Sequence, residues 1–205
     1  MRNLEEIART IQAELDERDT LREIAIKSSR AIIRMSGTII HLVHKNEDPL
    51  PMMREALDEV DRLRSLLDDH PILWNTGPVG DAMQEMAEAA IMLAIINDEQ
   101  FPGPEELGIP ARSWVMGLAD VVGELRRLSL ERLREGDVEA PERYLDIMEE
   151  IFLVLMTFDY PDAIVPLRRK QDIARSLLEK TRGDLTVALN SKRLEERMEE
   201  LYRKL

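Results

Sequence analysis

The positions of the prolines limit what this chain can fold into. A proline inside a helix removes a backbone hydrogen bond and clashes with the preceding turn, so helices run between prolines and not through them. Residues 1–48 and 167–205 contain no proline, which leaves room for a long helix at each end. The ten prolines stand at positions 49, 51, 71, 78, 102, 104, 110, 141, 161 and 166.

The proline-free segments predict an all-α fold, a helical bundle of about seven helices with a long N-terminal helix. Aromatic residues make up only 4% of the chain, a composition that favours helices over strands. The apolar stretches at 31–43 and 151–158 are rich enough in β-branched and aromatic residues to form strands, but each lies inside a longer helical pattern, so we interpret both as buried helix. The expected helices cover about residues 4–45, 51–69, 79–97, 110–136, 139–158 and 166 to the C-terminus, with one short turn in the loop 97–110.

Length and composition predict a single cytoplasmic domain. A chain of 205 residues fits one domain over 1–205, with 185–205 as a C-terminal helix extension. The absence of cysteine excludes disulfides and thiolate metal sites and fits a reducing compartment. The charged N-terminus lacks the apolar core of a signal peptide, and the longest apolar runs are far too short to span a membrane. We therefore expect no membrane partner.

Two carboxylates precede the most apolar segment of the chain. No Lys or Arg occurs between Arg64 and Arg112, whereas nine acids do. Glu85 and Glu88 are three residues apart, on one face of the expected helix, and the apolar sequence AAIMLAII follows them. Because close like charges repel, water, an arginine from another helix, a proton or a metal ion must neutralise this pair.

A second pair of acids lies on the next long helix. Asp120 and Glu124 share one face of an otherwise apolar run. If the two helices face each other, four carboxylates converge, and such hard oxygen ligands suit Mg²⁺ or Mn²⁺. The alternative is that both pairs are ordinary polar faces of amphipathic helices, with Glu124 paired to Arg127. A di-iron centre is not expected, because no histidine has a Glu three residues before it.

Basic residues gather on the N-terminal helix, although the net charge of −13 argues against a nucleic-acid partner. Five of them follow steps of three and four residues, with Gly37 at the one vacant step, and form what we call the cationic stripe. Two histidines are too few to bind a metal alone, so we assign them to this stripe. The cationic stripe consists of Lys27, Arg30, Arg34, His41 and His44.

A second basic cluster lies near the start of the last helix. Its cations outnumber the two acids between them, Asp172 and Glu179. Two interpretations of the basic regions remain open. They bind an anionic polymer, or they pair with acidic helices of the bundle or of a neighbouring subunit. The second cluster consists of Arg168, Arg169, Lys170, Arg175, Lys180 and Arg182.

Five segments together resemble the translin family, which includes translin and translin-associated factor X. They occur in family order and extend from about residue 20 to residue 185. GLADVVGELRR and LRRKQDIAR are the more specific of them, whereas a Glu-x-x-Glu alone would be a weak signal. The segments are IAIKSSRAIIRMSGTIIHLVHK, GDAMQEMAEA, GLADVVGELRR, FDYPDAI and LRRKQDIARSLLEKTRGD.

The resemblance implies a translin-like fold of about seven helices that assembles into a hollow homo-octamer and binds single-stranded RNA, or single-stranded DNA, inside that shell. It also implies a division of labour, because translin mainly binds whereas factor X is a Mg²⁺-dependent endoribonuclease. The acids of factor X fall on Glu85, Glu88, Asp120 and Glu124 of this chain. The resemblance therefore places this chain nearest factor X, as a prokaryotic, archaeal homologue, with these four acids as catalytic and metal-binding residues and the basic clusters as RNA contacts.

The sequence leaves two alternatives to this hypothesis. The chain could be a non-catalytic binder of single-stranded nucleic acid, in which the acids are structural. It could also be a purely structural oligomeric bundle, but that reading explains neither the cationic stripe nor the acids.

Overall fold

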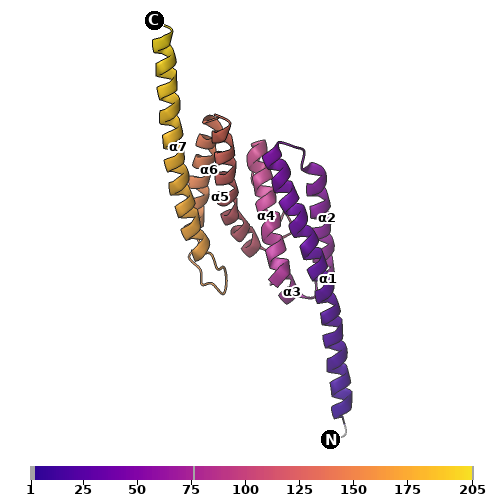
Figure 1. Ribbon diagram of the computed structural model, residues 1–205. Coiled ribbons are helices and arrows are strands. Elements are labelled where there is room, and N and C mark those ends of the chain that lie inside the picture. Colours follow the sequence, from indigo (N-terminus) through magenta and orange to yellow (C-terminus); the bar gives the residue numbers. More distant parts are fainter. Residues whose placement is uncertain (1–2, 76, 205) are drawn as a thin grey trace. The chain divides into compact units, whose positions relative to one another are not determined.

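The computed structural model describes residues 3–75 and 77–204, and within these ranges every regular element is an α-helix (Figure 1). This confirms the predicted all-α fold of about seven helices. The helices are α1 (Leu4–Lys45), α2 (Leu50–Leu66), α3 (Pro71–Asn75), α4 (Gly77–Asn97), α5 (Ala111–Arg134), α6 (Glu139–Leu155) and α7 (Arg168–Tyr202).

The chain forms two compact units, residues 1–117 and 118–205. The boundary falls within α5, whose first residues belong to unit 1 and whose remainder belongs to unit 2. The single domain expected over 1–205 stays a prediction.

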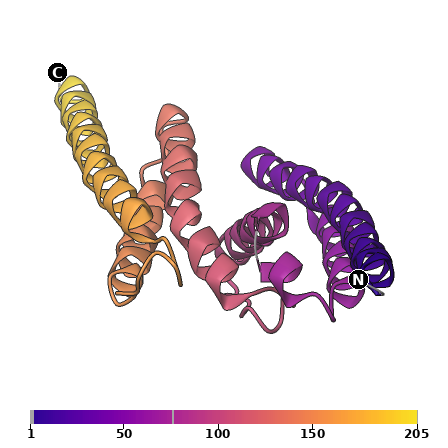
Figure 2. The same cartoon turned by 90° about the horizontal axis from the view of Figure 1, so that it is seen from below.

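Unit 1 is built on α1, α2 and α4, with α1 in contact with both of the others (Figures 1 and 2). The α1 face that points inward carries apolar residues such as Ile32 and Ile39, which are fully buried. Opposite them, α4 is apolar around most of its circumference, and Met86 and Ile91 are also fully buried. Burial of such side chains, at about 25 cal/mol per Å² of apolar surface, is the main force that holds the unit together.

The segment between α2 and α4 differs from the expected pattern. The second helix ends at Leu66 rather than Asp69, because Leu67 leaves the helical conformation, and the separate short helix α3 follows. The Asn75 side-chain amide donates to the carbonyl of Pro71 at 2.8 Å and closes this single turn. A short helix of this kind has no periodic pattern that a sequence could display.

Unit 2 contains the rest of α5 together with α6 and α7. The Arg126 guanidinium donates to Thr181 at 3.0 Å and to Asp184 at 2.9 Å, which links α5 to α7. The Gln171 amide donates to the carbonyls of Leu155 and Phe158, at 2.8 and 3.2 Å. These bonds satisfy carbonyls at the C-terminal end of α6, which stops at Leu155 rather than at Phe158 as expected.

Both long helices extend past the packed part of their own unit (Figure 1). Residues 4–20 of α1 and most of residues 186–204 of α7 are exposed. The helix α7 continues without a break through Gly183. Among the described residues, none of the helices is both long and apolar enough to cross a membrane.

Candidate nucleic-acid interface and acidic pairs

The cationic stripe lies on the outer face of α1, opposite its buried residues. Lys27, Arg30, Arg34 and His41 are exposed and His44 is half-buried. The inner face carries Ile32, Ser36 and other buried residues that are out of phase with the stripe, so packing of α1 on α2 and α4 leaves the stripe in solvent.

None of the described residues forms an ion pair with the side chains of Lys27, Arg30 or Arg34, although acids abound in this chain. Arg62 is a contrast, because it pairs with Glu59 at 2.5 Å and also donates to the hydroxyl of Ser28 at 2.9 Å. The three stripe cations are therefore available to an external anion.

The second basic cluster is divided between solvent and structural contacts. Arg168 and Arg169 are exposed at the start of α7. Arg182 pairs with Glu149 at 2.6 Å, and Arg175 lies over the ring of Phe152 at 5.7 Å. For these two residues, the contacts agree with the interpretation that the cations pair within the helical bundle. Lys170, also predicted to bind nucleic acid, is half-buried and pairs with Asp120.

The first acidic pair lies in unit 1. Glu88 is only 7% exposed and is flanked along α4 by the buried Ala87 and Ala89, whereas Glu85 is half-buried. Neither carboxylate is without a partner. A carboxylate this deeply buried is expensive to ionise unless it is compensated, so its position on an apolar helix calls for a specific role.

Gly117 allows the start of α5 to lie directly on α4 beside this pair. A Cβ atom at Gly117 would stand 2.5 Å from the Gln84 carbonyl oxygen and 2.7 Å from the Cβ of Ala87. Ser113, one turn earlier, donates its hydroxyl to the carbonyl of Gly80 at 3.0 Å. This contact was not predicted from the sequence, although Gly117 inside the helical run SWVMGLADVVGELRR is a signal for close backbone approach.

The second acidic pair lies in unit 2, and each member has a cation beside it. Asp120 pairs with the ammonium of Lys170 from α7, and the two side chains are 27% and 21% exposed. Glu124 pairs with Arg127 on its own helix at 3.5 Å, as the structural interpretation of this acid allowed. The sequence could not show the Lys170 contact, because the two residues are fifty positions apart.

The donor set of both pairs fits a hard divalent cation, since all four residues offer carboxylate oxygens and Glu88 supplies one of them from a buried position. Within residues 3–75 and 77–204, no group of three or more His, Cys, Asp or Glu side chains is arranged so that it could hold a metal ion. The assignment of Glu85, Glu88, Asp120 and Glu124 to one metal site stays a prediction.

The described helices define an all-helical protein with an exposed cationic stripe on α1 and two acidic pairs, on α4 and α5. No protein-family model matches the chain. It is 35% identical over 188 residues to the uncharacterized protein MJ0175 of Methanocaldococcus jannaschii, an alignment that covers 90% of this chain and 83% of that protein.

Two solved structures share the fold. One is AfC3PO in complex with duplex RNA, with a TM-score of 0.82 and 32% identity over 90% of this chain and 97% of that one. The other is apo-NeC3PO, with a TM-score of 0.79 and 20% identity over 92% of this chain and 98% of that one. The chain belongs to the C3PO/translin family.

Proposed function

We propose that this chain binds RNA along the cationic stripe of α1 and cleaves it as a metal-dependent endoribonuclease of the factor X type. The observation that carries the proposal is the exposed row of Lys27, Arg30 and Arg34, which no described acid neutralises in a chain of net charge −13. An acidic protein gains nothing in solubility from such a row, whereas a phosphate backbone would be attracted to it.

The geometry of the stripe suits a polyanion. Steps of three and four residues at 1.5 Å per residue place successive cations about 5 Å apart along the helix, close enough together to meet neighbouring phosphates of a strand. Arg168 and Arg169 add exposed cations from α7. The complex of AfC3PO with duplex RNA supports RNA as the ligand. The sequence resemblance favours single-stranded RNA, and single-stranded DNA as a second ligand.

The acids supply the catalytic half of the proposal. Glu85, Glu88, Asp120 and Glu124 would hold Mg²⁺ or Mn²⁺ through their carboxylate oxygens, and the ion would activate water and stabilise charge on the phosphodiester. The burial of Glu88 restricts the motion of its side chain. The ammonium of Lys170 holds Asp120 in place and offsets its charge while no other cation is bound.

The resemblance extends the proposal to assembly and location. We propose a cytoplasmic homo-oligomer, an octamer by analogy with the family, in which the stripes of several copies face one enclosed RNA. The alternative is a binder without catalysis. The ion pairs of Asp120 with Lys170 and of Glu124 with Arg127 are the observation that favours it, because they give these acids a structural role.

The deciding experiment incubates the pure protein with labelled single-stranded RNA, duplex RNA and single-stranded DNA, each with Mg²⁺ or with a chelator. We expect Mg²⁺-dependent cleavage within single-stranded RNA. Glu88→Gln and Asp120→Asn should each abolish cleavage while RNA binding and the melting temperature stay close to those of the wild type. The matched control is Glu106→Gln, which removes one exposed acid from the loop before α5. Binding without cleavage by the wild type would establish the non-catalytic alternative. Cleavage at the wild-type rate by a variant that combines Glu88→Gln with Asp120→Asn would exclude this site.

A further inference from the structure

The face of α1 that is buried from residue 25 onward continues along residues 4–20, where it is exposed. We call residues 4–20 the N-terminal arm. Leu4, Ile7, Ile11 and Leu15 belong to one ladder of three- and four-residue steps that leads through Arg18 and Arg22 to the buried residues at 25, 29, 32 and 36. These four apolar side chains are between 47% and 62% exposed. The arm therefore presents an apolar face that is largely open to solvent.

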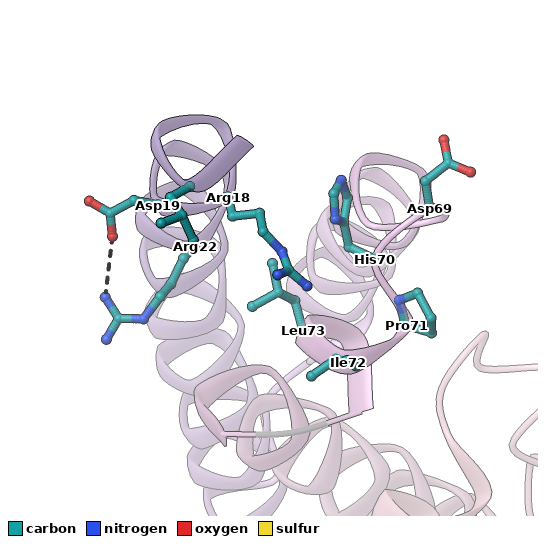
Figure 3. Close-up of a pocket in the computed structure, with 9 residues that line it drawn as sticks. Arg18, Asp19, Arg22, Asp69, His70, Pro71, Ile72 and Leu73 are labelled. Atoms are coloured by element: carbon teal, nitrogen blue, oxygen red, sulfur yellow. Dashed lines mark ion pairs between the residues drawn. The ribbon is translucent and has the colours of Figure 1, made fainter. Parts of the chain in front are cut away.

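A cavity of about 360 Å³ lies at the base of this arm, between α1 and the segment around α3 (Figure 3). Figure 3 shows Arg18 pointing into it toward Ile72 and Leu73. The cations here are compensated, because Arg18 is 3.9 Å from Glu14 and Arg22 is 3.9 Å from Asp19. A phosphate would find no net positive charge, whereas an apolar side chain would find Leu15, Ile72 and Leu73.

The far end of α7 carries a comparable face. In residues 186–204, the C-terminal arm, four apolar residues are between 49% and 67% exposed. They are separated by seven, four and three residues, the spacing of a coiled-coil seam. They lie on the side of α7 opposite its buried residues Leu178 and Leu185. The four are Val187, Leu194, Met198 and Leu201.

The net charges of the two arms indicate which apolar faces pack together. Residues 4–20 contain six acids and two bases, a net charge of −4, so two N-terminal arms would repel each other. Residues 186–204 contain five bases and four acids, a net charge of +1. The two arms thus both carry apolar side chains at helical spacing and attract in charge, whereas the net charge of each arm disfavours pairing with a copy of itself.

We infer that the N-terminal arm of one chain packs against the C-terminal arm of a second copy. The inference rests on one part of the proposed function, namely that copies of this chain form a homo-oligomer. The contact is head to tail, so each chain offers one face of each kind, and repeated contacts close into a ring or extend into a filament. The interface is made by helix ends that reach beyond the packed units, and it leaves the cationic stripe uncovered.

The chain lacks cysteine, so single introduced cysteines report contact between copies directly. Ile11→Cys and Leu194→Cys place a thiol in the middle of each face, and the control Arg9→Cys places one on the opposite side of the N-terminal arm. On mild oxidation, we expect the mixture of Ile11→Cys and Leu194→Cys chains to form a disulfide-linked pair at least tenfold faster than either variant alone. The mixture of Arg9→Cys and Leu194→Cys should stay near the background rate.

A charge exchange tests the same contact without a cross-link. Glu5→Lys, Glu14→Lys and Glu17→Lys together change the net charge of the N-terminal arm from −4 to +2, so both arms of that chain are basic. Lys192→Glu with Arg193→Glu changes the net charge of the C-terminal arm from +1 to −3, so both arms of the other chain are acidic. Each variant alone should lose mass in light scattering, and mixing the two should restore it. Asp58→Lys with Glu150→Lys, two exposed acids outside the arms, should leave the mass unchanged.

Three results would overturn the inference: a monomeric wild type, Ile11→Cys chains that cross-link as fast alone as in the mixture, and charge variants that assemble like the wild type. RNA titration of the same samples separates this failure from that of the proposed function. Chains with altered arms that still bind RNA overturn nothing in the proposed function, whereas a fully assembled wild type that binds no RNA overturns that function and leaves the interface intact.

Discussion

At the scale of single residues, α1 carries three serines on its inner face, and their surroundings differ. Ser28 accepts a hydrogen bond from Arg62 at 2.9 Å, and the hydroxyl of Ser36 lies 4.0 Å from the sulfur of Met86. Ser29 is fully buried, and its hydroxyl has no hydrogen-bond partner among the described residues. A buried polar group left unpaired costs about 1–3 kcal/mol, so these neighbours contribute to stability with opposite signs.

We therefore predict that Ser29→Ala stabilises the protein by about 1 kcal/mol, because it removes the desolvation cost of the hydroxyl. Ser28→Ala, the matched control one position away, should lower stability by a similar amount, since it takes an acceptor from Arg62. Urea unfolding of both variants measures the difference. Equal destabilisation by the two would show that Ser29 has a partner, such as a buried water.

A second prediction at this scale concerns acid. Hydrogen bonds from the Arg62 guanidinium lower the pKa of the Glu59 carboxyl below its usual 4.5; burial acts the other way, and the hydroxyl of Ser28 lowers it further. A carboxyl with a depressed folded-state pKa adds stability that is fully present above pH 4.5 and is lost as the pH falls through the lower folded-state value.

Thermal unfolding between pH 6 and pH 3 should thus show a loss of stability in the wild type that is smaller in Glu59→Gln. The control Glu55→Gln, an exposed acid one turn earlier on α2, should keep the wild-type pH dependence. Parallel curves for the wild type and Glu59→Gln would contradict a depressed pKa.

At the scale of helices, the sequence was most informative where a pattern was long. The bounds of α1 are those expected from the proline positions, and the stretches at 31–43 and 151–155 are helical despite their β-branched residues, because the tertiary packing of a longer amphipathic pattern outweighs local propensity. Helix α3 and the early end of α2 could not be predicted, since both depend on local turns and not on periodicity.

The candidate site follows the same rule. Spacing along one helix predicted which acids and which cations share a face. Contacts between helices, such as the pair of Lys170 with Asp120 and the approach of Gly117 to Gln84, depend on the fold and have no counterpart in local spacing.

Glycines in two helices give the prediction for this scale. Gly117→Ala places a Cβ 2.5 Å from the Gln84 carbonyl oxygen, a backbone atom that cannot move aside cheaply, and we expect a loss of about 1–3 kcal/mol in stability. Gly183→Ala is the matched control. No atom of the described residues lies within 4 Å of its Cβ, and alanine in a helix interior is worth about 0.5–1 kcal/mol over glycine, so this variant should gain stability. Denaturant unfolding that gave both changes the same sign would contradict the close contact of α5 with α4.

At the scale of the whole molecule, a net charge of −13 has to be reconciled with the proposed RNA ligand. The chain separates its charges, with the acids of the N-terminal arm at one end of α1 and the stripe of exposed cations further along it. A single stripe meets only a few phosphates, and several copies around one RNA would multiply these contacts while the acidic surfaces keep the assembly soluble. The affinity for RNA should then fall steeply as the salt concentration rises, although the chain as a whole is negatively charged.

Each phosphate of a single strand that a cation neutralises contributes about −0.7 to the slope of log affinity against log salt concentration. Arg30→Ala with Arg34→Ala should flatten this slope by more than 1 per chain in contact and weaken binding to all RNA sequences alike, while light scattering shows an unchanged assembly. The control Arg54→Ala with Arg112→Ala removes two exposed arginines outside the stripe, and it should leave the slope as in the wild type. RNA titrations at four or more salt concentrations measure all three proteins. If both double variants shift the slope equally, the RNA responds to overall charge, and the stripe on α1 is an ordinary solvent-facing surface.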